Sequence, residues 1–312
     1  MRAIVTGGAG FIGSHLVEAL LSRGAYVQII DDLSTGRLSN VPKGASLHQM
    51  DIASDQAYEW IVRERPDVVY HLAGQANVLK SMADPAADAR VNVLGTIKLL
   101  TACKQASVSR FIFASTAAVY GSTVQDRLRE TDPIQPVSFY ALSKSFSEHY
   151  IRLFSEFHHL PYTILRFSNV YGPRQQPQGE GNVIPLFMKQ LLEGQPITIH
   201  GDGNQTRDFV NVNDVVIALL SATLLGRHGT YHVSTGTSIS VNELAKRLIA
   251  IHGAPHPIVH TESPRAGDTV HSCLDNQKAS SELFWQPTVH FDDGLREVYE
   301  AFMLQGKCFR LT

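Results

Sequence analysis

The feature that most constrains the fold is the segment VTGGAGFIGSHL at residues 5–16. Gly7, Gly10 and Gly13 follow a short apolar run and precede a helical pattern. Glycines at this spacing let the backbone turn tightly and approach a pyrophosphate, whose charge the N-terminus of the helix stabilises. The triplet alone is weak evidence, because tight turns use glycine for other reasons. The segment predicts a strand–turn–helix unit that binds a nucleotide.

Strand-like and helix-like segments alternate over the first half of the chain. One helical pattern, at residues 14–24, ends at Gly24 as a C-terminal cap would. The strand-like segments are short and apolar nearly throughout, which is typical of parallel strands buried on both faces. They are residues 3–7, 26–31, 68–73, 111–115 and 162–167. The alternation predicts an α/β fold with a doubly wound parallel (Rossmann) sheet.

The composition changes after about residue 170. Residues 169–185 are rich in Pro, Gly, Gln and Asn and predict a long functional loop. Beyond it we expect a strand and a helix over 209–225, a strand at 230–234, and helices at 240–253 and 292–306. The helix at 240–253 should be capped by Ser240 or Asn242 and should end at Gly253. We therefore predict a nucleotide-binding domain from 1–169 plus about 209–235, and a smaller interleaved α/β substrate lobe from about 170–208 and 236–312.

The second predicted strand ends at Asp31, eighteen residues beyond Gly13. A carboxylate there accepts hydrogen bonds from adenosine ribose hydroxyls and repels the 2′-phosphate of NADP. The alternative is that Asp31 and Asp32 only cap a turn. Arg37 would favour NADP, but it lies beyond the acidic pair. We predict NAD.

Tyr140 and Lys144 are four residues apart in a helical pattern, so their side chains share one helix face. A lysine cation, helped by a positive nicotinamide, would lower the pKa of the phenol from about 10 and make it a useful base. Ser115 or Thr116, at the end of the preceding strand, would hydrogen-bond the same substrate hydroxyl. Alone, the pair also fits a surface lysine beside a core tyrosine.

Several further motifs follow in order: DDLSTG, HLAGQ, NVLGT, YALSK, RFSNVYGPRQ, GDGNQTRDFVNVNDV and RAGD. With them, nearly the whole chain resembles the extended short-chain dehydrogenases/reductases of the NAD-dependent sugar-nucleotide epimerase/dehydratase family. Within that family the chain is most similar to UDP-glucose 4-epimerases and their relatives that accept N-acetylhexosamines.

The resemblance implies that Tyr140 is the catalytic base, Lys144 its partner and Thr116 the hydroxyl that contacts O4 of the sugar. It implies that Asn92 positions Lys144. The implied NAD-binding residues are Gly7, Gly10, Phe11, Ile12, Gly13, Asp31, Asp32, Ser34, Thr35, Gly36, Asp51, Ile52, Leu72, Ala73, Gly74, Gln75, Asn92, Tyr140 and Lys144.

The resemblance also implies that the second lobe clamps a nucleotide diphosphate. Two guanidinium groups from distant loops suit that ligand, although each arginine alone is also consistent with an ordinary surface residue. Ser272 falls where small residues admit an N-acetyl group and a tyrosine blocks it. The implied substrate-binding residues are Thr116, Asn169, Asn182, Val183, His200, Arg207, Arg265, Asp268 and Ser272.

The implied reaction is reversible C4 epimerisation of a UDP-hexose through a 4-ketone with bound NAD. Dehydratases and decarboxylases of the family carry an acid in the turn where this chain has Ala117 and Ala118. UDP-glucuronate 4-epimerisation, a thymidine nucleotide and a non-catalytic NAD-binding regulator stay open as alternatives.

The rest of the composition narrows the partners. The formal charge of −2 favours neither nucleic acid nor an anionic membrane. No apolar run reaches membrane-spanning length, the first residues are unlike a signal peptide, and three scattered cysteines suit a cytoplasmic protein. The histidines lack metal-ligand spacing, so we expect no metal. Apolar stripes on two helical patterns, together with the resemblance, predict a homodimer.

Overall fold

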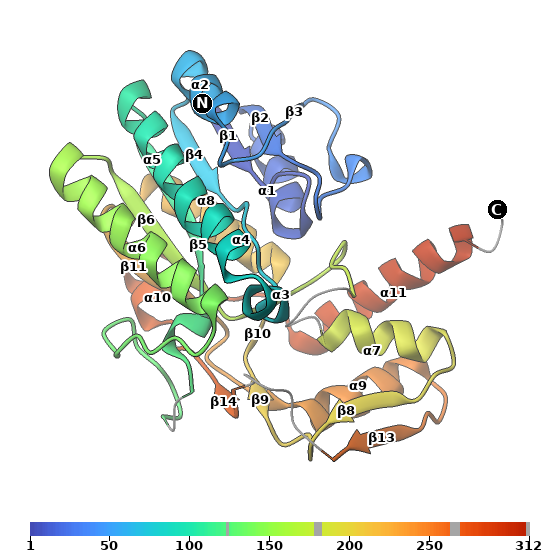
Figure 1. Ribbon diagram of the computed structural model, residues 1–312. Helices are drawn as coiled ribbons and strands as arrows, with labels where there is room; N and C mark the ends of the chain where they lie inside the picture. Colours follow the sequence, from blue (N-terminus) through green and yellow to red (C-terminus); the bar gives the residue numbers. More distant parts are fainter. Residues whose placement is uncertain (123–124, 178–182, 263–268, 310–312) are drawn as a thin grey trace.

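A seven-stranded parallel sheet forms the centre of the protein (Figure 1). The computed structural model describes residues 1–122, 125–177, 183–262 and 269–309. The strand order is β11-β6-β5-β4-β1-β2-β3. The strands are β1 (Arg2–Thr6), β2 (Tyr26–Asp31), β3 (Ser46–Gln49), β4 (Val68–His71), β5 (Arg110–Thr116), β6 (Tyr162–Phe167) and β11 (Gly229–Val233). The predicted doubly wound sheet is confirmed.

Helices cover both faces of this sheet. On one face lie α1 (Phe11–Leu21), α8 (Val212–Leu224) and α10 (Gln277–Leu283). On the other lie α2 (Asp55–Glu64), α5 (Gly95–Ala106) and α6 (Phe139–His158). Successive residues of β1 point to opposite faces of the sheet. Ala3 and Val5 pack against the helices of the first face, and Ile4 packs against those of the other face. Burial on both faces explains why the strands are apolar at nearly every position.

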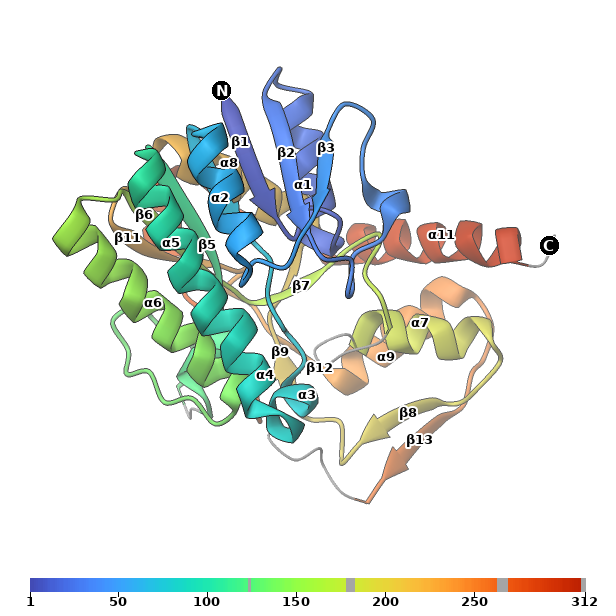
Figure 2. The same ribbon diagram turned by 45° about the horizontal axis from the view of Figure 1, so that its top comes forward.

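A second core gathers the later segments of the chain. Its helices are α7 (Val183–Leu192), α9 (Val241–His252) and α11 (Phe291–Phe309), and α11 projects from the rest of the molecule in Figure 2. Three small sheets accompany them. Their strands are β7 (Asn169–Tyr171) with β10 (Phe209–Asn211), β9 (Thr206–Arg207) with β12 (Ile239–Ser240) and β14 (His271–Ser272), and β8 (Ile197–His200) with β13 (Ile258–Thr261). The predicted boundaries between the two lobes stay a prediction.

The loop predicted over 169–185 is partly wrong. Residues 169–171 form β7, which pairs in parallel with β10, and α7 begins at Val183. β4 ends at His71 rather than at residue 73. Ser240, not Asn242, caps α9, and Gly253 ends it in the left-handed conformation as predicted. None of the described helices has the length and apolar character needed to cross a membrane.

The remaining described elements are short. They are the 3₁₀ turns η1 (Leu38–Asn40) and η3 (Ala117–Tyr120), helices α3 (Val78–Ala83) and α4 (Pro85–Ala89), and the π-helical turn η2 (Arg90–Leu94). The strand order reverses between β1 and β4, and in such sheets ligands bind beyond the carboxyl ends of the strands at this point. We therefore expect the functional site at this edge of the sheet.

Candidate active site

The glycine turn after β1 leaves the N-terminus of α1 open. Gly7 adopts a positive φ of 71°, and Gly10 donates its N–H to the Gly7 carbonyl at 3.1 Å. A side chain at position 13 would place its Cβ 2.1 Å from that carbonyl oxygen, so this close approach requires glycine. No side chain caps α1 at Gly10. The backbone N–H groups of the first turn therefore offer an anion site.

Asp31 orders this turn. Its carboxylate accepts hydrogen bonds from the N–H groups of Ala9 and Leu33, both at 2.9 Å. Burial raises the pKa of Asp31, and the two backbone hydrogen bonds only partly offset that effect. Asp32 accepts from Ser34 in the same way. Asp31 and Asp32 therefore do cap the turn, as the alternative interpretation expected. The contact of Asp31 with the ribose hydroxyls of NAD stays a prediction.

The loop after β4 forms the opposite wall. A Cβ at Gly7 would lie 2.7 Å from the Ala73 nitrogen, so the two loops touch. Ile52 is buried against Gly95, and Asp51 forms an ion pair with Arg90 at 2.7 Å. The predicted cofactor residues thus surround the ends of β1, β2 and β4.

Tyr140 lies at the second residue of α6, and Lys144 lies one turn later. Lys144 is 5% exposed and its Nζ donates to the Ala114 carbonyl at 3.0 Å. Burial raises the pKa of Tyr140 to about 12, against a lowering hydrogen bond with Thr116. Burial also lowers the pKa of Lys144 to about 8, against the raising charges of Asp88 and Glu148.

Burial thus dominates the pKa of the phenol in the polypeptide itself. The lowered pKa of Tyr140 that we expect beside a bound, positively charged nicotinamide stays a prediction. Burial brings the pKa of Lys144, about 8, close to neutral pH, so the lysine is closer to losing its proton than an exposed lysine.

The choice between Ser115 and Thr116 is decided by which side of β5 each residue faces. Ser115 is buried and donates its hydroxyl to Glu148 at 2.6 Å. Thr116 instead lines a cavity together with Tyr140. Thr116 is therefore the hydroxyl available to a ligand.

The cavity has a volume of about 340 Å³ and lies between the two cores. On the sheet side, Ala117 and Ala118 join Thr116 and Tyr140 in its wall. The predicted substrate residues that line it from the second core are Asn169, Val183, His200, Arg207 and Ser272. Asn182, Arg265 and Asp268 lie outside the described residues.

The chain matches known proteins over nearly its whole length. The family model described as GDP-mannose 4,6 dehydratase matches residues 4–298. A UDP-glucose 4-epimerase of Mycolicibacterium smegmatis is 38% identical over 97% of this chain and 98% of that protein. The crystal structure of the Thermotoga maritima UDP-glucose 4-epimerase with UDP-glucose is 40% identical, with a TM-score of 0.95 over 98% of this chain and 99% of that one. The Thermus thermophilus UDP-glucose 4-epimerase in complex with NAD is 40% identical, with a TM-score of 0.93 over 97% of this chain and 99% of that one.

The chain belongs to the NAD-dependent sugar-nucleotide epimerase/dehydratase family.

In this family member, the pairing of β9 with β14 sets Ser272 opposite Arg207. Arg207 is 9% exposed and donates to the Thr206 carbonyl at 2.8 Å. His200 contacts Thr261 through Nδ1 at 3.2 Å. Short strands distant in sequence thus bring the predicted sugar and diphosphate residues to one wall of the cavity.

Sequence reasoning missed several lining residues of this enzyme. Ser168 and Gln205 lie in motifs that carried the resemblance, and their position beside predicted residues was the available signal. Leu186 and Phe187 line the cavity from α7, a helix absent from the sequence prediction.

Proposed function

We propose that this enzyme catalyses the reversible C4 epimerisation of a UDP-hexose with bound NAD. The observation that carries the proposal is the cavity that combines Thr116 and Tyr140 with Ala117, Ala118 and the second-lobe residue Arg207. It places the phenol of Tyr140, a proton-transfer group, beside a turn of two methyl groups. It also offers a guanidinium for a phosphate.

The glycine turn fits a dinucleotide. The open N-terminus of α1 suits a pyrophosphate, and the close approach at Gly13 lets the backbone reach it. Asp31, beside this turn, would receive the ribose hydroxyls. Arg37 donates instead to the side chain of Gln176, which supports NAD over NADP. When bound, NAD supplies reversible acceptance of a hydride from C4 of the sugar.

The chain's own residues would handle the proton of the 4-hydroxyl. Tyr140 Oη removes that proton and later returns it, with Thr116 Oγ1 orienting the hydroxyl. Arg207 would hold the diphosphate while the sugar turns over. The small side chains of Ala117, Ala118 and Ser272 leave room for both faces of the ring.

The cavity wall argues against dehydration. Among the described residues that line it there is no Asp or Glu. Removing water across C5 and C6 needs a further acid and base near the sugar, and alanine supplies neither.

The wall also disfavours a glucuronate. Arg207 is the only Arg or Lys among the described lining residues, and the diphosphate engages it in our proposal. Among the described lining residues a sugar carboxylate would then find no Arg or Lys of its own to offset its lost hydration. Ser272 leaves space for an N-acetyl group, so we propose that UDP-GlcNAc and UDP-GalNAc are accepted as well.

Proton NMR of mixtures with UDP-glucose, UDP-GlcNAc, UDP-glucuronate and UDP-xylose tests the proposal. We expect UDP-glucose to be converted to UDP-galactose and UDP-GlcNAc to UDP-GalNAc, with no loss of water. A new sugar methyl signal would indicate dehydration and contradict the proposal. Turnover of UDP-glucuronate alone would favour the glucuronate alternative.

We also propose a homodimer. One side of α6 exposes an apolar stripe at helical spacing along the whole helix. Its residues are Phe139, Leu142, Phe146, Tyr150, Leu153 and Phe157. An apolar surface of this length favours burial against a second copy of the same face.

A further inference from the structure

Asp88 is a buried carboxyl group close to the catalytic lysine, and no motif of the sequence pointed to it. It lies in α4 and is 1% exposed. Its Oδ1 accepts hydrogen bonds from Gln75 Nε2 at 2.9 Å and from Asn92 Nδ2 at 3.2 Å. Its Oδ2 is buried and has no hydrogen-bond partner among the described residues. A buried carboxylate oxygen without a partner is costly, so this arrangement calls for a function.

The partners of Asp88 connect it to the catalytic helix. Asn92 Nδ2 also donates to Ser143 Oγ at 3.0 Å, and Ser143 directly precedes Lys144 in α6. Asn92 Oδ1 accepts from the Gln75 backbone at 2.9 Å. The π-helical turn that contains Asn92 widens the helix at this point, a distortion that often marks functional sites.

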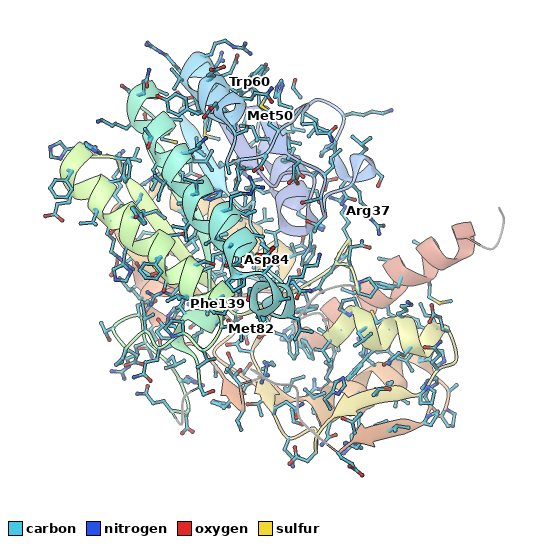
Figure 3. All side chains as sticks on the ribbon, viewed as in Figure 1. Arg37, Met50, Trp60, Met82, Asp84 and Phe139 are labelled. Carbon is cyan, nitrogen blue, oxygen red and sulfur yellow. The ribbon has the colours of Figure 1, made fainter. Side chains whose placement is uncertain are left out.

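Gly74 shows how close Asn92 and Lys144 come. A Cβ at this glycine would lie 3.0 Å from Asn92 Oδ1 and 3.1 Å from Lys144 Nζ. α4 packs directly on α6, and Figure 3 shows Asp84 and Phe139 where these helices meet. Asp88, on the same short helix, is buried, while Asp84 is exposed.

The other charged groups around Lys144 are already paired or neutral. Glu148 is bound by Arg166 at 2.6 and 2.9 Å, so its charge already has a cationic partner. His71 from β4 contacts Thr6 and Thr96, and burial holds its pKa well below the ordinary value.

The other charged groups on α3, α4 and η2 are also either paired or exposed to solvent. Arg90 pairs with Asp51, whereas Lys80 and Asp84 are exposed to solvent. Asp88 is therefore the carboxyl group near Lys144 that lacks a cationic partner of its own within the described part of the chain.

We propose that Asp88 is a positioning residue of the reaction, which orients Asn92 and supplies the negative charge that keeps Lys144 a cation beside Tyr140. The inference rests on the proposed function, because it assigns Asp88 to the same proton transfer. Asp88 reaches the reacting atoms only through its neighbours and does not contact the cavity in the described structure.

The electrostatic effect has a definite sign. Burial lowers the pKa of Lys144, and the charge of Asp88 acts against burial by raising it. Burial raises the pKa of Tyr140, and the charge of Asp88 raises it further. Removing that charge lowers both pKa values. The acid and alkaline limbs of the pH–rate profile belong to this coupled pair, so both limbs move toward lower pH.

Asp88→Asn is the appropriate variant, because its side-chain oxygen can keep the hydrogen bonds from Gln75 and Asn92 while the charge is lost. We expect both limbs of the pH profile of kcat to move down by about one pH unit, the lower end of the effect of one nearby charge. The ¹³Cε resonance of Lys144, labelled with ¹³C-lysine and assigned with Lys144→Arg, should titrate at a pH lower by the same amount in the enzyme without substrate.

Asp84→Asn is the matched control. It removes a carboxylate from the N-cap of the same short helix, but Asp84 is exposed and asparagine caps equally well. Both readouts should match the unmodified enzyme in this variant. A lower rate in Asp88→Asn with unmoved limbs and an unmoved Lys144 titration would overturn the proposal. If the enzyme failed to turn over any UDP-sugar, the proposed function would fail, whereas the Lys144 titration would still test Asp88.

Discussion

The turn after β5 illustrates how single residues determine which groups face the cavity. Thr116 and Tyr140 bring one hydroxyl and one phenol to the cavity, and Ala117 and Ala118 bring only methyl groups. Ser115, adjacent to Thr116, faces the interior and is held by Glu148. The hydroxyls were recognisable in the sequence, but which of them faces the cavity depends on the pleat of β5 and became clear only in the structure.

Tyr140→Phe should lower turnover by roughly 10²–10⁴-fold, because phenylalanine cannot transfer the proton of the 4-hydroxyl. Binding of UDP-sugar, measured by calorimetry, should change little, since the nucleotide contacts that we propose lie in the second lobe. Tyr58→Phe, which alters a partly buried tyrosine on α2 that does not line the cavity, should leave both quantities unchanged. Equal losses of binding and turnover would argue against Tyr140 as the base.

Ser272→Tyr should reduce turnover of UDP-GlcNAc relative to UDP-glucose by at least about tenfold, because the ring fills space that the N-acetyl group needs. Ser272 lines the cavity beside Arg207, its partner in the pairing of β14 with β9. Ser272→Ala removes the hydroxyl but keeps the space, so the ratio of the two kcat/KM values should stay as it is. An unchanged ratio in Ser272→Tyr would place the N-acetyl pocket elsewhere.

At the scale of elements, the predictable strands were those with strong local patterns. β2 and β6 have the bounds that their continuous apolar runs predicted. β3 was missed because its residues Ser46, His48 and Gln49 are polar and suit a partly exposed edge. β9 and β14 have two residues each. They form only because the fold brings segments distant in sequence together, so no local sequence pattern predicts them.

The contact between α6 and the sheet depends on a buried ion pair, and its loss should destabilise the fold. Arg166 and Glu148 are 2% and 0% exposed and 2.6 Å apart. Glu148→Gln leaves the guanidinium buried without its counter-charge, which should lower the free energy of unfolding by about 3–5 kcal/mol in urea denaturation at neutral pH. Glu243→Gln, which breaks an exposed pair with Arg247 on α9, should cost at most about 1 kcal/mol.

The same pair makes stability depend on acid. Burial alone would raise the pKa of Glu148, but the hydrogen bonds and charge of Arg166 outweigh it, so the pKa lies below the ordinary 4.5. Its contribution is therefore present above that ordinary value and is lost as the pH falls through the lowered one. As the pH falls below about 5, the midpoint of thermal unfolding of the unmodified protein should fall. In Glu148→Gln the midpoint should depend less on pH. An identical acid dependence in both proteins would exclude Glu148 as a cause.

At the scale of the whole molecule, two cores meet at the cavity, and the chain crosses between them several times. The doubly wound sheet followed from the alternation of patterns. The grouping of Arg207 and Ser272 with Tyr140 was predicted only through the family resemblance, because it depends on contacts between segments far apart in sequence. The buried groups Asp88 and Glu148 were missed for the same reason, since their roles come from neighbours on other elements.

The α6 stripe is an apolar surface that stays exposed along one side of the helix, and it supports the last prediction. Phe146 lies midway along it and is 50% exposed. Phe146→Glu places a charge in the centre of the proposed dimer interface, where it would be desolvated without a partner. Sedimentation equilibrium should give twice 34.4 kDa for the unmodified protein and 34.4 kDa for the variant. Leu224→Glu, at the end of α8 on the opposite face of the sheet, is the control and should keep the dimer mass.

If both variants stayed dimeric, the interface would lie on another surface. If the unmodified protein were a monomer, the homodimer proposal itself would be wrong.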